Sequence, residues 1–162
     1  MRAAEPSDVV GCEACDLSTG RVHPPGGRIF ETSAWLVEHC VGPMGLGALI
    51  VKPRRHVTHV AELSDDEADE LGPLLKRASK IAGDLVGAEQ VYNCLWSHAG
   101  GRPVHLHYVV QPVTDDQMTR HGSHGPLLQV AMFVNDEPPP ADVVERIADR
   151  ARALFREPPT AP

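Results

Sequence analysis

The sequence lacks long apolar runs and lacks an excess of positive charge. No stretch approaches the about 18 consecutive apolar residues that a transmembrane helix needs, and residues 1–11 contain no apolar run of the signal-peptide type. The net charge is −7 and the pI about 5.7, whereas sequence-independent binding to nucleic acid requires a basic surface. We therefore expect a cytoplasmic protein that binds neither membranes nor nucleic acid.

Cysteines are few, and no internal repeat is present. With 162 residues, 42% of them hydrophobic and 23% charged, the chain is large enough to bury the core of one domain. We expect a flexible leader at 1–11, a single domain at 12–156 and a disordered tail at 157–162. In a reducing compartment, Cys12 and Cys15 are metal ligands or idle thiols rather than a disulfide.

Residue patterning predicts a sheet with helices on one side. Ser64 and Glu67 have the spacing of a capping box, and an apolar stripe at helical spacing runs from there to Gly87. Pro73 lies inside this stripe and is expected to kink or split the helix. A second amphipathic helix is expected at 141–155. Strands are expected at 28–32, 34–38, 48–51, 90–96, in the histidine-containing stretch 101–112, and at 127–134. This order indicates an α+β fold with an antiparallel sheet.

The stretch from Gly101 to Pro112 contains two histidines in alternation with apolar residues. Read as a strand, it places His105, His107 and Val109 on one face, with the two imidazoles about 7 Å apart. The other face is apolar and belongs to the core. A buried core histidine is the ordinary explanation for a single imidazole, but two on the same face indicate a functional site.

Residues 100–112, Gly-Gly-Arg-Pro-Val-His-Leu-His-Tyr-Val-Val-Gln-Pro, resemble the signature of the histidine-triad (HIT) superfamily. Residues 50–56, Ile-Val-Lys-Pro-Arg-Arg-His, resemble the end of a strand in that family, and Cys12-Glu-Ala-Cys15 resembles the Cys-x-x-Cys of its zinc-bearing members. The resemblance implies an antiparallel sheet of about five strands, one long helix and a C-terminal helix. It also implies a homodimer.

The resemblance further implies a structural zinc ion held by Cys12, Cys15, His56 and His105. In zinc-bearing HIT proteins, and in the related galactose-1-phosphate uridylyltransferases, these positions complete the site. Four protein ligands close a tetrahedral shell and leave no position for water. His59 is the competitor for His56.

The second histidine of the signature, His107, then corresponds to the catalytic nucleophile of the family. The resemblance implies attack on the α-phosphate of a nucleotide, with the other ring nitrogen oriented by a backbone carbonyl. Such a protein hydrolyses or transfers the nucleotidyl group of a phosphoanhydride, phosphoester or phosphoramidate. Candidates for binding the phosphate are Asn93, Ser97, Gly100, Gly101 and Arg102.

The signature is incomplete at two positions. Val109 stands where the third histidine belongs, and Gly101 where a glutamine is usual. The uridylyltransferase branch also lacks that histidine. His98, His121 or His124 could supply the missing donor. The alternative to an enzyme is a non-catalytic, zinc-stabilised nucleotide-binding protein with a decayed or repurposed triad.

Overall fold

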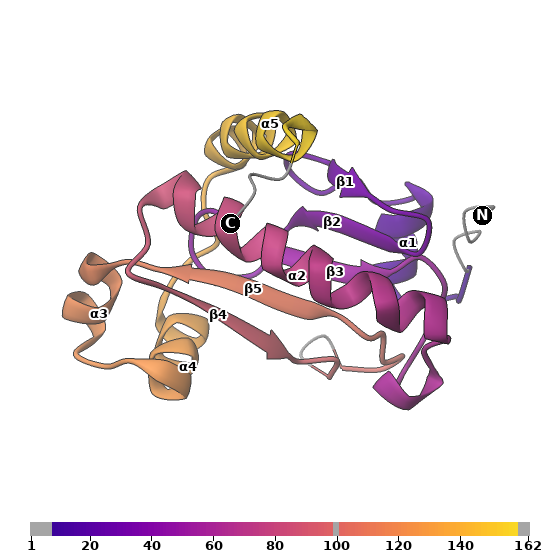
Figure 1. Ribbon diagram of the computed structural model, residues 1–162. Helices are drawn as coiled ribbons and strands as arrows, with labels where there is room; N and C mark the ends of the chain where they lie inside the picture. Colours follow the sequence, from indigo (N-terminus) through magenta and orange to yellow (C-terminus); the bar gives the residue numbers. More distant parts are fainter. Residues whose placement is uncertain (1–7, 99–100, 159–162) are drawn as a thin grey trace.

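A computed structural model describes residues 8–98 and 101–158 as a five-stranded antiparallel sheet with helices, which confirms the predicted α+β fold (Figure 1). The strand order is β1-β2-β3-β5-β4. The strands are β1 Arg28–Glu31, β2 Trp35–His39, β3 Leu49–Pro53, β4 Gln90–Leu95 and β5 Tyr108–Val113. The helices are α1 Glu13–Thr19, η1 Val60–Glu62, α2 Asp65–Val86, α3 Asp115–His121, α4 Gly125–Asn135 and α5 Ala141–Arg156.

One face of the sheet is covered by α2 and α5, which pack against each other as well as against the strands (Figure 1). The main core lies in this layer. It contains Trp35, Val37, Leu49, Val51, Leu106 and Val110 from the sheet side and Leu74, Ala78, Ile81, Leu85, Ile147 and Phe155 from the helices. None of the helices in the described ranges is long and apolar enough to span a membrane.

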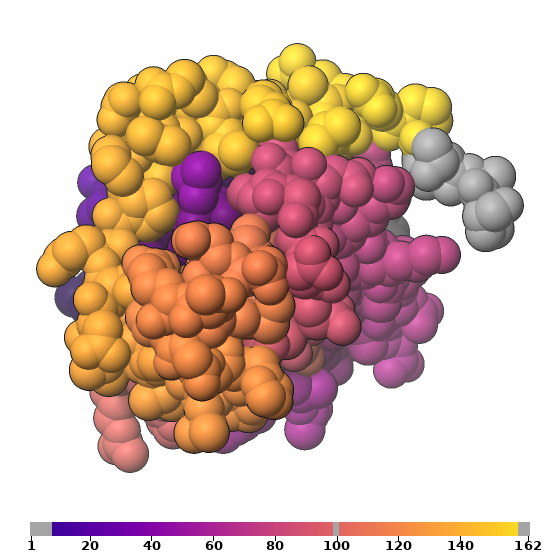
Figure 2. Space-filling view, turned by 90° about the vertical axis from the view of Figure 1, so that its left-hand side faces the viewer, coloured from indigo at the N-terminus to yellow at the C-terminus, as the bar shows by residue number. Residues whose placement is uncertain are grey.

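The opposite face of the sheet is only partly covered. The short helix α1 lies over β3, where Lys52 Nζ donates a hydrogen bond to the Ala14 carbonyl at 3.1 Å. At the other end, α4 packs on β5 through Gln129, whose side-chain amide donates to Gln111 Oε1 at 2.9 Å. Seen from the side of α3 and α4, these helices form one block at the end of the sheet (Figure 2). Between α1 and α4, the described residues of this face form a pocket.

Helix α2 is continuous, so the expected split at Pro73 does not occur. The capping box is confirmed, because Ser64 Oγ accepts from the Glu67 N–H and Glu67 Oε2 accepts from the Ser64 N–H. Gly87 ends the helix with a φ of 64°. Pro73 is exposed, so the Asp69 carbonyl that loses its helical partner can bond to water instead.

One expected strand is wrong, and another begins later than expected. The stretch 127–134 belongs to α4, whose buried residues Leu128, Gln129 and Met132 follow helical spacing. The histidine-containing strand begins only at Tyr108, because its pairing with β3 and with β4 ends at that residue. The preceding residues have another partner, since the Leu106 N–H donates to the Val57 carbonyl at 2.7 Å.

Helices α1 and α3 were not expected from the sequence, and each is only seven residues long. The outermost parts of the expected leader and tail, residues 1–7 and 159–162, lie outside the described residues.

Replacing Pro73 with alanine is expected to stabilise the protein. Alanine restores one helical hydrogen bond, while the freer unfolded chain offsets part of the gain. We expect the free energy of unfolding to rise by roughly 1–2 kcal/mol in urea denaturation. Lys76→Ala, an exposed change on the same helix, is the control and should have a much smaller effect. A lower stability for Pro73→Ala would show that the proline is needed for the packing of α2.

Candidate metal centre and active site

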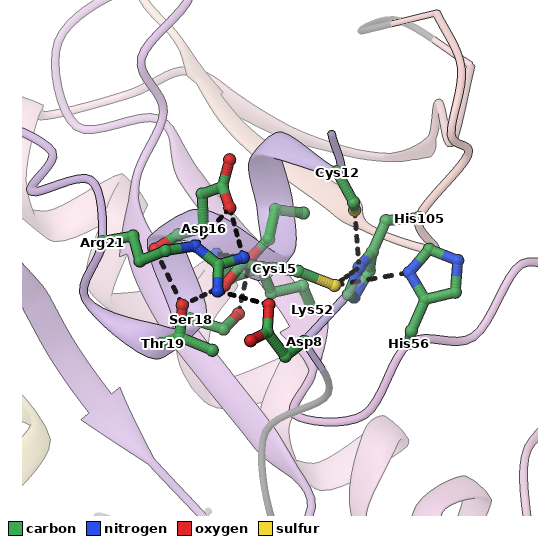
Figure 3. Close-up of polar contacts among 11 residues, drawn as sticks. Asp8, Cys12, Cys15, Asp16, Ser18, Thr19, Arg21, Lys52, His56 and His105 are labelled. Atoms are coloured by element: carbon green, nitrogen blue, oxygen red, sulfur yellow. Dashed lines mark hydrogen bonds and ion pairs between the residues drawn. The ribbon is translucent and has the colours of Figure 1, made fainter. Parts of the chain in front are cut away.

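Two cysteines and two histidines meet where α1 lies against the sheet (Figure 3). Cys12 precedes α1 and Cys15 lies in its first turn, whereas His56 follows β3 and His105 precedes β5. The His105 Nδ1 atom is 3.5 Å from Cys12 Sγ and 3.6 Å from Cys15 Sγ. The His56 Nδ1 atom is 3.4 Å from Cys15 Sγ. All four ligand atoms lie within 4.8 Å of one another.

This donor set fits a zinc ion. With zinc bonds of about 2.3 Å to sulfur and about 2.0–2.1 Å to nitrogen, a tetrahedral site separates sulfur from nitrogen by about 3.5 Å. The three measured distances are close to this value. The Nε2 atom of His105 faces the Pro53 carbonyl at 3.3 Å, so its N–H donates there and Nδ1 is left for the metal. The cluster is therefore compatible with structural zinc.

Burial disfavours the charged forms of His105 and Cys15 in this cluster. Desolvation lowers the pKa of His105 to about 4, and the nearby His56 and Lys52 act in the same direction. Burial also raises the pKa of the Cys15 thiol to about 11. Metal binding must therefore displace thiol protons, which makes the affinity for zinc strongly dependent on pH.

His107 is half-buried and held in one orientation. Its Nδ1 lies 3.0 Å from the carbonyl oxygen of His105, so the Nδ1–H donates to that backbone group. A neutral imidazole that donates from Nδ1 has its lone pair on Nε2. The arrangement can therefore present a nucleophilic nitrogen, and its orienting group is the backbone carbonyl expected from the family resemblance.

A pocket of about 230 Å³ opens beside His107, on the sheet face between α1 and α4. Val109 also lines it and packs with Cys40, Met44 and Ala48, so the position of the missing third histidine is apolar. The remaining walls are Glu13, Ala14 and Leu17 of α1, Glu38 to Gly42, Ile50, Lys52, Trp96 and Phe133 of α4.

The sequence reasoning missed the charged pair in this pocket. Lys52 Nζ lies 2.7 Å from Glu38 Oε2, and the two side chains are 1% and 4% exposed. The sequence contains a sign of this pair, because both are charged residues inside strands whose other residues are mostly apolar. His39 was also missed. Its Nδ1–H donates to the Cys40 carbonyl and its Nε2 accepts from Gly47, while burial lowers its pKa.

None of the expected phosphate-binding residues that the structure describes lines this pocket. Asn93 bonds to Ser79 of α2, on the opposite face of the sheet. Ser97 lies in the turn after β4, and the Gly101 N–H donates to the His98 carbonyl at 2.9 Å. Arg102 is exposed, and the prediction for Gly100 lies outside the described residues.

The other candidate histidines are also separate from the cluster and the pocket. His59 is exposed and precedes η1. His121 is paired with Asp136, its Nε2 lying 3.1 Å from Oδ1. His98 and His124 are exposed, in the turn after β4 and at the start of α4.

Comparison with known proteins finds no matching family model. A curated relative is the adenosine 5'-monophosphoramidase of Schizosaccharomyces pombe, which is 27% identical over 108 residues, or 64% of this chain and 76% of that protein.

Solved structures with the same fold align over a larger share of this chain. A histidine-triad nucleotide-binding protein of Sulfolobus tokodaii aligns with a TM-score of 0.67 and 19% identity, covering 90% of this chain and 92% of its own. A zinc-bound histidine-triad family protein of Mycobacterium smegmatis aligns with a TM-score of 0.65 and 17% identity, covering 90% and 96%. A HIT-like protein of Bartonella henselae gives a TM-score of 0.68 at 14% identity, covering 91% and 98%.

Protein purified without added metal is expected to contain about one zinc ion per chain. Cys12→Ser and His56→Ala should each lose the metal and lower the melting temperature, because structural zinc contributes folding free energy directly. Cys94→Ser, which changes a thiol outside the cluster, is the control and should keep its zinc. Elemental analysis with thermal denaturation checks this, and a metal-free protein of unchanged melting temperature would contradict it.

Zinc-free protein is expected to lose stability as the pH falls from about 6.5 towards 4. The pKa values of His105 and His39 are lower in the folded protein than in the unfolded chain, so below about 6.5 the unfolded chain binds more protons. The His105 contribution amounts to about 3 kcal/mol once the pH reaches 4. Urea denaturation of zinc-free protein between pH 7.5 and 4.5 measures it. His59→Gln changes an exposed histidine and should leave the slope of the unfolding free energy against pH unchanged. A slope of opposite sign would show that His105 and His39 do not cause the pH dependence.

Proposed function

We propose that this chain is a nucleotide hydrolase or nucleotidyl transferase with His107 as its nucleophile. The proposal is supported by a fold shared with histidine-triad proteins and by sequence similarity to an adenosine 5'-monophosphoramidase. The observation that carries the proposal is the hydrogen bond from His107 Nδ1 to the His105 carbonyl at 3.0 Å. It leaves the lone pair of Nε2 for attack, and His107 lines a pocket large enough to hold part of a nucleotide.

In the proposed first step, His107 Nε2 attacks the α-phosphorus. An N–P bond forms, the bond from phosphorus to the leaving group breaks, and the leaving group departs with the electron pair of that bond. In the second step, water or another acceptor attacks the same phosphorus and releases a proton to the solvent. The N–P bond then breaks and His107 is restored. The covalent intermediate divides one difficult displacement into two easier ones.

The zinc cluster has a supporting role in this proposal. Zinc, when bound, would fix α1 and the segment that contains His105. The backbone carbonyl of His105 then orients His107, so the same residue would serve the metal with its side chain and the nucleophile with its backbone. Four protein ligands leave zinc without an open position, so the reacting groups come from the pocket rather than from the metal.

Val109 is expected to limit the rate. Its side chain lines the pocket beside His107 and has no hydrogen-bond donor or acceptor. A departing oxygen or nitrogen therefore receives no proton from this position. Removal of one donor from a site of developing negative charge costs about 10²–10³ in rate. Slow turnover is expected, and it should be slowest for leaving groups that need a proton.

A nucleotidyl group is expected on His107 after the protein is mixed with a nucleotide donor and quenched. Peptide mass spectrometry would locate it. His107→Ala should abolish both the label and turnover, whereas His124→Ala, a change at an exposed histidine, should preserve them. Full turnover by His107→Ala would refute the nucleophile assignment. Ligand binding without any label would favour the non-catalytic alternative.

Introducing the missing donor is expected to raise the rate. Val109→His should increase turnover by up to about 10²–10³ if this position alone is limiting. Because Val109 is buried among apolar side chains, the melting temperature must be measured alongside the activity. Val109→Gln is a second variant with a polar group at the same position. If both variants fold and neither is faster than the parent, Val109 does not limit the reaction.

A further inference from the structure

The His107 pocket contains a buried ion pair that the proposed chemistry does not use. Glu38 on β2 and Lys52 on β3 lie on the partly covered face of the sheet, with 2.7 Å between Oε2 and Nζ. Both line the pocket, although their side chains are only 4% and 1% exposed. Lys52 also donates to the Ala14 carbonyl (Figure 3).

Stability does not explain this pair. Removing two charges from water is expensive, and apolar residues of similar size often serve stability as well or better. Apolar side chains are also compatible with this wall, since the neighbouring Ile50 and Val109 line the same pocket. A charged pair at such a place is therefore more readily explained by what the pocket binds.

The pair also has unused hydrogen-bonding capacity. A carboxylate offers about four acceptor positions. Within the described part of the chain, the contact with Lys52 is the only polar contact of the Glu38 carboxylate. Lys52 has three N–H donors, and its two partners are Glu38 and the Ala14 carbonyl. A ligand that reaches this wall would thus meet several strong acceptor positions beside one donor.

The strand order indicates which part of a nucleotide would reach Glu38. Glu38 pairs with Ile50 of β3, and Ile50 pairs with Val109 of β5. Glu38 therefore lies two strands from β5, or about 10 Å at the usual strand spacing. A nucleotide with its α-phosphorus at His107 would bring its base, the part farthest from the phosphate, towards Glu38. Trp96 and Phe133, two aromatic side chains of the same pocket, are suited to stacking on that base.

We infer that Glu38 and Lys52 recognise the nucleobase and select guanine; this inference rests on the proposed function. Guanine presents two adjacent N–H donors, N1–H and the 2-amino group, next to the O6 acceptor. The carboxylate accepts from the two donors and the ammonium donates to O6. Adenine offers the carboxylate only its 6-amino group and offers Lys52 the ring nitrogen N1 in place of a carbonyl, so the carboxylate accepts one hydrogen bond from adenine but two from guanine. A site built for such hydrogen bonds rejects analogues that lack them, because its buried polar groups are then left unpaired.

The test is isothermal titration of the zinc-loaded full-length protein with GMP, IMP, AMP and dGMP. GMP should bind at least about tenfold more tightly than AMP, which corresponds to one good bidentate contact. IMP retains N1–H and O6 but lacks the 2-amino group, so it should lie between them. The nucleotide dGMP should match GMP, because the inference assigns the carboxylate to the base and not to the ribose.

Variants at the pair provide the matched comparison. Glu38→Gln should reduce the preference for GMP over AMP to less than about threefold by removing an acceptor. The double variant Glu38→Met with Lys52→Met replaces the charges with apolar groups and should lose the preference. Because it also removes the hydrogen bond from Lys52 to the Ala14 carbonyl, its melting temperature is measured alongside the affinities. Glu13→Gln is the control, since Glu13 lines the same pocket but is exposed, and it should retain the preference.

Equal affinities for GMP and AMP in the parent protein would overturn the assignment of the pair and leave the proposed function standing. Weaker binding of dGMP than of GMP, without discrimination between bases, would also overturn it by assigning the carboxylate to the ribose. If none of the four nucleotides binds at millimolar concentration, the proposed function itself fails.

Discussion

The attachment of α1 to the sheet is the constraint on which the pocket depends. This helix has seven residues, too few to be stable by itself. It is held by the approach of Cys12 and Cys15 to two histidines and by the hydrogen bond from Lys52 to the Ala14 carbonyl. Because α1 supplies one wall of the pocket, whatever holds the cysteines in place also determines the shape of the pocket.

A single residue joins the metal centre to the candidate nucleophile. The imidazole of His105 approaches the cysteines, while its backbone carbonyl accepts the Nδ1–H of His107. A displacement of His105 would therefore change the orientation of His107 directly. In the proposed function, a metal ion bound by His105 would therefore influence the orientation of His107 without taking part in the reaction.

Local sequence rules predicted those features that depend on neighbouring residues. The capping box of Ser64 and Glu67 and the glycine after α2 are short-range patterns, and they are present as expected. The HIT resemblance supplied what local rules could not, namely that four ligands distant in sequence would meet. Predictions of secondary structure failed where contacts with distant parts of the chain determine it. The segment forming α4 is mostly apolar, so its composition alone did not distinguish a buried helix from a strand.

The prediction of the site was limited by the same cause. The family resemblance places Asn93 near polar phosphate-binding positions, but the pleat directs its side chain to the helix side, where it bonds to Ser79. Glu38 and Lys52 were overlooked because neither strand reveals by itself that the two charges meet across β2 and β3. The location of polar groups in a sheet requires the register between strands, and one sequence does not specify that register.

The contact between Cys12 and His105 joins positions separated by 93 residues. A metal ion held there would act as a reversible cross-link that closes more than half of the chain into one loop. Closing a loop of this length lowers the entropy of the unfolded chain by the equivalent of about 4.5 kcal/mol in the disulfide analogy. Zinc would thus give the chain the topological benefit of a disulfide while its cysteines remain unoxidised thiolates.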